Sequence, residues 1–365
     1  MNGSKKCFAQ VIGGFNTRLV IPVYQRNYDW KPENCARLLD DRSEMVKDGR
    51  EEHFFGSIVS QTPHGERVII DGQQRITTVF LLFAAIAKQL EDGVVTSENP
   101  HRADMIERGY LVDEWARDEQ KLRLKLIKSD SAALEAVLAD ACPQDPSLPA
   151  PELVMSSSVT QNYLYFKDRL ASMPVSLDQL IEAIEHLCVI DITLDPTDDA
   201  QLIFESLNSK GKPLTTADLV RNYLLLAQTH EEQTRLYDEY WDPIEGMFQP
   251  DPGSLRLDNA IQGWLSVRFR KVRARGRDEV YSVFKQYVED EFTGTTESLL
   301  HELRNFCMIW AENYRYHAVK KYKSAFKWAE NGAPTLVSHY QKKESTNQAY
   351  ADSLRAKMDS TDATL

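Results

Sequence analysis

The hydrophobic pattern of the chain changes most clearly between residues 68 and 90. The run Val68–Ile70 is β-branched and apolar, which predicts the end of a buried strand. Asp71-Gly72 interrupts this run, and from Gln73 to Leu90 apolar residues recur every three or four positions, as on one face of a helix. The pattern therefore predicts a strand, a short turn and a helix in direct succession.

Polar side chains in the first turn of the predicted helix make a candidate anion site. Gln73, Gln74 and Arg75 follow the turn directly. The first turn of a helix has free backbone N–H groups and the positive end of the helix dipole, which favour a phosphate, and Gly72 lets an anion approach the backbone. The same residues also fit an ordinary strand–turn–helix joint with a polar cap, and their spacing does not decide between the two interpretations.

Shorter patterns predict further strands among the helices of the first half of the chain. Val20-Ile21 predicts a short strand, which Pro22 places at a sheet edge or in a loop because proline donates no ladder hydrogen bond. Another strand is predicted at His53–Val59, where Gly56 indicates a close approach by a backbone or a ligand. A later strand at Cys188–Leu194 is expected to return to the same sheet.

Two domains are predicted from these patterns. Strands and helices without a regular βαβ alternation predict an α+β domain in the first part of the chain. Helical spacing from residue 230 onward predicts an all-helical second domain. Its expected packing residues are Tyr237, Trp241, Phe248, Trp264, Phe269, Phe284, Tyr287, Phe306 and Trp310.

Three aromatic residues alternate with amide and guanidinium groups just before the first long helix. The segment holds Tyr24, Gln25, Arg26, Tyr28 and Trp30. Such a mixture suits stacking on a base and contact with a phosphate. An aromatic loop packed on the domain surface is the other interpretation.

A polar corner between two predicted helices is the second cluster of interest. Its polar residues are Glu205, Asn208, Lys210, Asp218, Arg221 and Asn222. Thr215, with Asp218 three residues later, predicts a capped helix start. Three interpretations remain open: a DNA-reading helix–turn–helix, a wall of a ligand site with Glu205 or Asp218 near a metal, and a capped helical corner.

Charge and cysteine content narrow the class of protein. The net charge of −12 argues against a chain that coats nucleic acid non-specifically. Six basic residues between Arg268 and Arg277 are nevertheless expected to form either a phosphate-contacting loop or a solvated helix end. The five scattered cysteines form no C-x-x-C pair, so neither a disulfide framework nor a zinc knuckle is expected. Without a signal segment or an apolar run long enough for a bilayer, we predict a cytoplasmic protein with no membrane partner.

Four motifs, in their order and spacing, resemble the N-terminal domain of GmrSD-type restriction proteins over about residues 8–226. They are Ile21-Pro-x-Tyr-Gln-Arg-x-Tyr-x-Trp30, His53-Phe-x-Gly56, Ile70-Asp-Gly-Gln-Gln-Arg-x-Thr-Thr78 and Phe204-Glu-x-Leu-Asn-x-x-Gly-x-Pro-Leu-Thr-x-x-Asp-Leu219. The resemblance implies a ParB/sulfiredoxin-like fold that binds and hydrolyses a nucleotide in bacterial antiphage restriction. Its extent sets the expected domain bounds, with the α+β domain over residues 1–226 and the all-helical domain over residues 227–365. It also implies that the nucleotide site falls on Asp71 to Arg75, with Tyr24 to Arg26 beside it.

The same family implies DNA and a nuclease as partners. In its phosphorothioate-sensing, SspE-like members, the Tyr-Gln-Arg segment also takes part in recognising modified DNA. Full-length members usually carry a C-terminal His-Asn-His-type nuclease domain, whose Glu-His pair is not evident around His301, His317 or His339. We therefore expect either the regulatory half of a split system or the front part of a longer protein.

Our hypothesis from the sequence is a nucleoside-triphosphate hydrolase module, with Mg²⁺ as cofactor, that gates restriction of phage DNA. The residues expected to act in catalysis are Asp71, Gln73, Gln74, Arg75 and Gln25, with Asp71 also binding the metal. Those expected to contact the nucleotide are Gly72, Arg26, Tyr24, Thr77, Glu205 and Asn208. Those expected to contact DNA are Tyr24, Arg268, Arg270, Lys271 and Arg273.

Two other functions stay open at this point. A non-hydrolysing DNA-binding or adaptor module would use the same arginines on DNA phosphates. A metal-dependent nuclease would have to rely on Asp71, Glu205 and Asp218. The sequence also leaves open a homo-oligomer.

Overall fold

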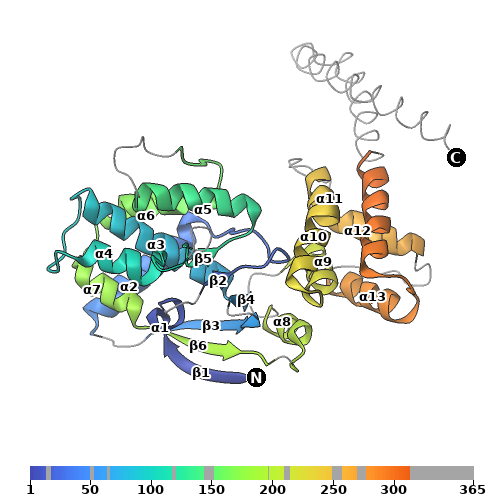
Figure 1. The fold of residues 1–365 in the computed structure, drawn as a ribbon, viewed down its shortest axis with the longest axis horizontal. Coiled ribbons are helices and arrows are strands. Elements are labelled where there is room, and N and C mark those ends of the chain that lie inside the picture. The colour runs from blue at the N-terminus through green and yellow to red at the C-terminus, as the bar shows by residue number, and fades with distance from the viewer. Residues whose placement is uncertain are drawn as a thin grey trace, which may run out of the picture. The chain divides into compact units, whose positions relative to one another are not determined.

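A computed structural model describes residues 1–13, 18–49, 53–63, 66–116, 121–143, 152–195, 197–208, 214–248, 257–268 and 277–312. The chain divides into two compact units, residues 1–213 and 214–365 (Figure 1). The first unit is mixed α and β, and the described part of the second is helical, as the sequence predicts. The predicted domain boundary at residue 226 follows the extent of the family resemblance, and it stays a prediction.

A six-stranded mixed sheet is the framework of the described part of the first unit. The strand order is β1-β6-β3-β4-β2-β5, and the strands are β1 (Asn2–Cys7), β6 (Leu187–Thr193), β3 (His53–Gln61), β4 (Arg67–Asp71), β2 (Leu19–Val20) and β5 (Leu124–Lys125). β3 and β4 form an antiparallel hairpin, and β1 is antiparallel to β6, whereas the other neighbours are parallel. The predicted return of the chain to the first sheet through β6 is confirmed.

The expectation of an edge or loop position for the segment before Pro22 is wrong in one respect. β2 lies inside the sheet, between β4 and β5, although it is only two residues long. Pro22 falls beyond the end of β2, and the N–H of Ile21 just before it still donates to the carbonyl oxygen of Lys125 at 2.9 Å. The proline therefore ends the strand rather than placing it at an edge.

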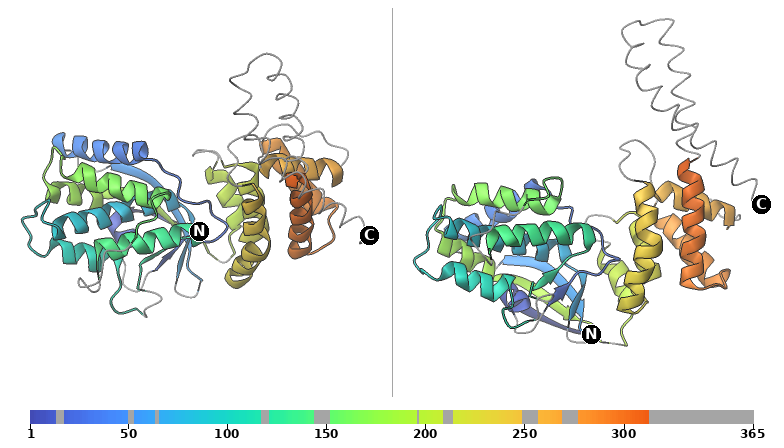
Figure 2. Two further views of the ribbon diagram at one scale, coloured as in Figure 1. Left: turned by 90° about the horizontal axis from the view of Figure 1, so that it is seen from above. Right: turned by 45° about the horizontal axis from the view of Figure 1, so that its top comes forward.

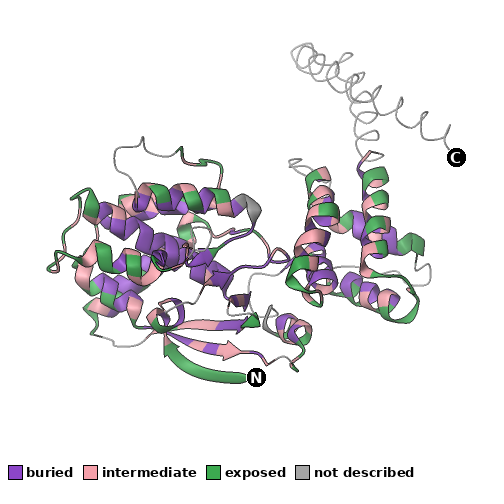
Figure 3. Cartoon of the chain, viewed as in Figure 1, coloured by how far each residue is buried: buried purple, intermediate pink, exposed green. Residues whose placement is uncertain are grey.

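The helix α3 (Gln73–Glu91) is the centre of the helical layer of the first unit. It packs against α4 (Arg102–Ile106), the π-helical turn η2 (Glu107–Leu111), α5 (Lys128–Ala141) and α6 (Ser158–Leu170). Figure 3 shows α3 buried along most of its length, in agreement with fully buried residues such as Phe80 and Phe83. A helix that is apolar on nearly every side is stable only as the core of a larger unit.

Four further helices belong to the described part of the first unit, and the first three of them supply residues to the same core (Figure 2). They are α1 (Phe8–Ile12), α2 (Pro32–Lys47), α7 (Leu177–Glu185) and α8 (Ala200–Asn208). α2 packs against α6 and α7, and α8 packs against β4. β4 is the strand directly before the predicted nucleotide turn, so α8 lies beside the strand that leads into this turn.

A buried ion pair ties the strands of the first unit together. The Arg67 guanidinium pairs with Asp191, donates to Ser60 Oγ at 2.9 Å and donates to the carbonyl oxygen of Val11 at 3.3 Å. Lys6 Nζ donates to the second carboxylate oxygen of Asp191 at 2.7 Å. Removing one partner of such a pair leaves a buried charge unpaired, which is costly.

Helices make up the described part of the second unit. Its elements are α9 (Thr216–Leu226), α10 (His230–Leu236), the π-helical turn η4 (Tyr237–Trp241), α11 (Asp242–Met247), α12 (Leu257–Arg268) and α13 (Arg277–Asp290). Residues 296–312 form a further helix. Its core contains the predicted residues Trp241, Trp264 and Phe284. Phe269 lies outside the described residues. Among the described helices of the chain, none combines the length and the apolar character needed to cross a membrane.

Candidate functional site

The predicted strand, turn and helix are present as β4, Gly72 and α3. Gly72 has a φ of +103°, and a Cβ there would lie 3.1 Å from Ile58 Cγ1 and 3.2 Å from the carbonyl oxygen of Ser57. Both the positive φ and the close approach of β3 therefore require glycine at this position. The turn is fixed by its neighbours on β3 rather than free to adapt.

The first turn of α3 presents three backbone donors that the described structure leaves unused. Within the described residues, no acceptor is found for the N–H groups of Gln73, Gln74 and Arg75. The N–H of Ile76 is the first to bond within the helix, to the carbonyl oxygen of Gly72 at 3.0 Å. Free N–H groups at the start of a 19-residue helix, together with its dipole, attract an anion.

The Arg75 side chain folds back toward β3. Its Nη2 donates to the carbonyl oxygen of Ser57 at 2.6 Å and lies 3.1 Å from Asp71 Oδ2. Its Nε is buried and has no hydrogen-bond partner in the described part of the chain. The guanidinium is thus anchored on one side and keeps an unused donor, although the side chain is still 26% exposed.

Two glutamines attach the aromatic loop to this junction. Gln25 Nε2 donates to the carbonyl oxygen of Ile70 at 2.7 Å. Gln74 Nε2 donates to the carbonyl oxygen of Asn27 at 3.1 Å, and its Oε1 accepts from the N–H of Asp29 at 3.0 Å. Both amides therefore position the loop beside the turn. The Gln73 amide, in contrast, makes no hydrogen bond within the described residues.

The loop brings Arg26 to the junction and buries Tyr24. Arg26 lies between the two attached residues, Gln25 and Asn27, with Nη1 3.9 Å from Asp29 Oδ2 and a buried Nε that has no hydrogen-bond partner among the described residues. Tyr24 is only 2% exposed, and this burial raises the pKa of its phenol. In this conformation Tyr24 has no open ring face for a base to stack on. Thr77 is 1% exposed and is likewise enclosed.

Buried polar residues on distant helices support the loop, and no pattern in the sequence indicates them. Asp130 on α5 accepts from the N–H of Tyr28 at 2.6 Å, and burial raises the pKa of this carboxyl group. The Tyr28 hydroxyl lies 2.8 Å from Thr78 Oγ1, and Asn162 on α6 donates to it at 2.9 Å. Short motifs do not reveal such partners, because they come from far along the chain.

The polar corner divides between the two units. In the first unit, Glu205 on α8 accepts from Gln201 Nε2 at 2.9 Å, and the Asn208 side chain lies outside the described residues. In the second unit, Asp218 bonds with Thr215 in the predicted cap and lies 2.8 Å from Arg221. The start of α9 is therefore a capped helical corner in which Asp218 already has partners.

The basic run is described only at its ends. Arg268 is half-exposed and pairs with Glu302, and Arg277 lies 2.6 Å from Asp278. Arg270, Lys271 and Arg273 lie outside the described residues. The predicted DNA contacts of this run stay predictions.

No ready-made metal centre is present in the described chain: no three His, Cys, Asp or Glu residues there converge to hold an ion. At the junction, the Asp71 carboxylate is 24% exposed. One accessible carboxylate fits Mg²⁺ only if phosphate oxygens and water supply the other ligands, which is the usual arrangement for a nucleotide-bound Mg²⁺.

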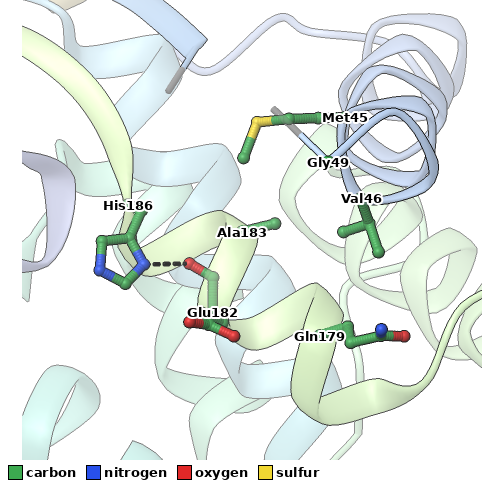
Figure 4. Close-up of a pocket in the computed structure, with 7 residues that line it drawn as sticks. All are labelled: Met45, Val46, Gly49, Gln179, Glu182, Ala183 and His186. Atoms are coloured by element: carbon green, nitrogen blue, oxygen red, sulfur yellow. Dashed lines mark hydrogen bonds between the residues drawn. The ribbon is translucent and has the colours of Figure 1, made fainter. Parts of the chain in front are cut away.

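A separate pocket of about 420 Å³ lies between α2 and α7 (Figure 4). Its lining residues are Met45, Val46, Gly49, Gln179, Glu182, Ala183 and His186. His186 Nδ1 lies 2.9 Å from the carbonyl oxygen of Glu182, as the dashed line in Figure 4 marks. None of the residues predicted from the sequence to bind nucleotide, metal or DNA lines this pocket.

One protein-family comparison covers the region of the junction. The family model described as "GmrSD restriction endonuclease, N-terminal domain" matches residues 8–225. This range includes β4, α3, the aromatic loop and α8. No curated protein matches the chain.

Proposed function

The chain belongs to the GmrSD restriction endonuclease N-terminal domain family, and from this membership we propose that its β4–α3 junction binds and hydrolyses a nucleoside triphosphate. The family associates the chain with restriction of DNA by an endonuclease. The nucleotide activity and its site are our proposal.

One observation carries the proposal. The three unused N–H groups at the start of α3 lie in the same turn as Arg75, whose Nε is buried without a hydrogen-bond partner in the described part of the chain. Arg26, whose chain neighbours Gln25 and Asn27 are bonded to the junction, has a second such Nε. Buried donors without acceptors are unfavourable, and a polyphosphate would supply the missing acceptors.

Each residue of the junction would have its own role in phosphoryl transfer. The backbone donors of Gln73 to Arg75 would cradle phosphate oxygens, and the guanidinium groups of Arg75 and Arg26 would neutralise charge that develops during transfer. Gln73, whose amide has no bond to the described chain, is the glutamine free to orient a water molecule. Gln25 and Gln74 hold the loop in place.

Asp71 is the residue that would hold Mg²⁺ at this junction. The ion, when bound, would supply charge neutralisation for the phosphates. In the described structure the Asp71 carboxylate lies 3.1 Å from Arg75 Nη2, so Arg75 and the metal compete for it. A phosphate that accepts from Arg75 would weaken its attraction for Asp71 and so make this carboxylate available to the metal.

We further propose that nucleotide turnover gates a nuclease and responds to DNA. Tyr24 would take part in sensing modified DNA only after the loop opens, because it is buried in this conformation. Arg268 and the basic residues after it would contact DNA phosphates. We also propose that the first unit is a ParB/sulfiredoxin-like form of the α+β class, which comparison of an experimental structure with that fold would test.

Phosphate release tests the proposed activity directly. Wild-type protein would be assayed with each nucleoside triphosphate and Mg²⁺, with and without phosphorothioate-modified DNA. Arg75→Ala should lower turnover by about 10²-fold or more, as loss of a transition-state donor does. Arg108→Ala is the matched control, because Arg108 is 64% exposed in an ion pair with Glu114.

The control measurements separate loss of function from loss of fold. Circular dichroism and thermal unfolding should show that Arg75→Ala remains folded. If wild-type protein releases no phosphate from any nucleotide, yet binds DNA with an affinity that falls steeply with salt, the proposal fails and the chain is a DNA-binding adaptor.

A further inference from the structure

Gly56, in the middle of β3, has a backbone conformation that other residues rarely adopt. Its φ is +109°, and the pairing of β3 with β6 shifts register between Phe54 and Gly56. Such irregularities bend a strand and redirect the groups beside it. The sequence indicated a close approach at Gly56 by a backbone or a ligand, but the approaching group is a side chain.

That side chain is Arg75. A Cβ at position 56 would lie 3.2 Å from both Cζ and Nη1 of Arg75 and 3.3 Å from its Nε. Three guanidinium atoms at nearly equal distances from this point indicate that the flat face of the group covers the position that a side chain at residue 56 would occupy. The next residue, Ser57, supplies the carbonyl oxygen that accepts from Arg75 Nη2 at 2.6 Å.

Gly56 and Ser57 therefore form what we call the seat of the guanidinium. Gly56 leaves the space that the flat face of the group occupies, and the Ser57 carbonyl oxygen accepts its hydrogen bond. An arginine side chain in solution samples many rotamers, and a ligand that bound it would have to restrict them. A seated guanidinium has lost this freedom before the ligand arrives, which favours binding. The buried Nε shows that, among the described residues, the seat leaves a donor of Arg75 unused.

We infer that Gly56 is a positioning residue for the nucleotide site, because its missing side chain creates the seat that orients Arg75 toward a phosphate. This inference rests on the proposed function of the Asp71–Arg75 turn. Gly56 itself does not touch the nucleotide. It acts through Arg75, so its effect should disappear when the guanidinium is replaced.

A double-mutant cycle measures this dependence. The affinity for non-hydrolysable analogues of ATP and GTP, in Mg²⁺, would be compared for wild type, Gly56→Ala, Arg75→Lys and the double variant. Gly56→Ala should weaken binding about tenfold in wild type and less than about twofold with lysine at position 75, because an ammonium has no planar group to seat. An equal loss in both backgrounds would overturn the inference, because the glycine would then serve the fold alone.

Gly93→Ala controls for the backbone strain of alanine at positive φ. Gly93 has a φ of +68°, and a Cβ added there would meet no atom of the described residues within 4 Å, so its replacement adds strain without a collision. It should leave nucleotide affinity unchanged. Thermal unfolding of both variants would show the stability cost separately from the binding effect.

A second measurement keeps the inference testable if Gly56→Ala does not fold. In ¹⁵N spectra of wild-type protein, a seated Arg75 should give a resolved Nε–H signal, assigned by its loss in Arg75→Lys, that shifts when nucleotide binds. A signal averaged with those of exposed arginines would overturn the seat. Failure of wild type to bind any nucleotide would overturn the proposed function as well, whereas undiminished binding by Gly56→Ala would overturn the seat alone.

Discussion

Replacing Asp71 with asparagine should strengthen binding of a metal-free nucleotide. In the structure Asp71 Oδ2 lies 3.1 Å from Arg75 Nη2, and the two side chains are 24% and 26% exposed. A phosphate that accepts from the unused Nε of Arg75 must share the charge of the guanidinium with Asp71. The substitution keeps the shape of the side chain and removes the competing charge, so the attraction of the guanidinium acts on the phosphate alone.

The size of the effect follows from the exposure of the pair. A partly exposed ion pair contributes about 0.2–1 kcal/mol, which corresponds to about a 1.4- to 5-fold gain in affinity. Loss of the repulsion between the Asp71 carboxylate and the phosphates acts in the same direction. With Mg²⁺ present the sign should reverse, because the variant lacks the carboxylate that we assign to the metal.

Isothermal titration with a non-hydrolysable triphosphate, in chelator and then in Mg²⁺ at fixed ionic strength, measures both effects. Asp40→Asn is the matched control, because Asp40 forms a 3.1 Å pair with Arg169 away from the junction and carries the same charge. If Asp71→Asn binds metal-free nucleotide no more tightly than Asp40→Asn does, Asp71 does not compete with phosphate for Arg75.

Two further predictions concern stability. Asp191→Ala should lower the free energy of unfolding by about 3–5 kcal/mol in urea titrations, because it leaves the buried Arg67 guanidinium unpaired, and a loss under about 1 kcal/mol would contradict this expectation. The pKa of Asp178 is lowered from 3.8, because burial, which raises it, is outweighed by hydrogen bonds and charge from the segment 97–102. The Asp178 carboxylate therefore contributes to the free energy of unfolding above pH 3.8, and this contribution is lost as the pH falls through the folded pKa. The difference in stability between wild type and Asp178→Asn should shrink over the same pH range. A difference independent of pH would refute the assignment.

The elements of the junction and the cap at Thr215 were predictable because their signals are local. The switch from the β-branched run to helical spacing occurs within a few residues around Gly72, and the cap at Thr215 is a four-residue pattern. Each of these depends on neighbours along the chain. Their geometry follows from backbone sterics and capping hydrogen bonds, which a sequence pattern reports directly.

The roles of the loop residues were not predictable in the same way. A mixture of aromatic, amide and guanidinium groups does not show which side chains point outward, and the structure buries Tyr24 and uses Gln25 to hold β4. The interior place of β2 depends on pairing with β5, about a hundred residues later. The support of Tyr28 by Asp130 is equally distant in sequence, so only the folded chain reveals it.

Hydrogen exchange at the start of α3 tests the central claim most directly. The N–H groups of Gln73, Gln74 and Arg75 have no acceptor in the described structure, so their exchange should be fast without ligand and slow with a saturating non-hydrolysable triphosphate and Mg²⁺. We expect protection in peptides that cover residues 71–79 and 22–30 of wild type, and its loss in Arg75→Ala. Nucleotide binding that leaves these peptides unprotected would contradict the proposed site.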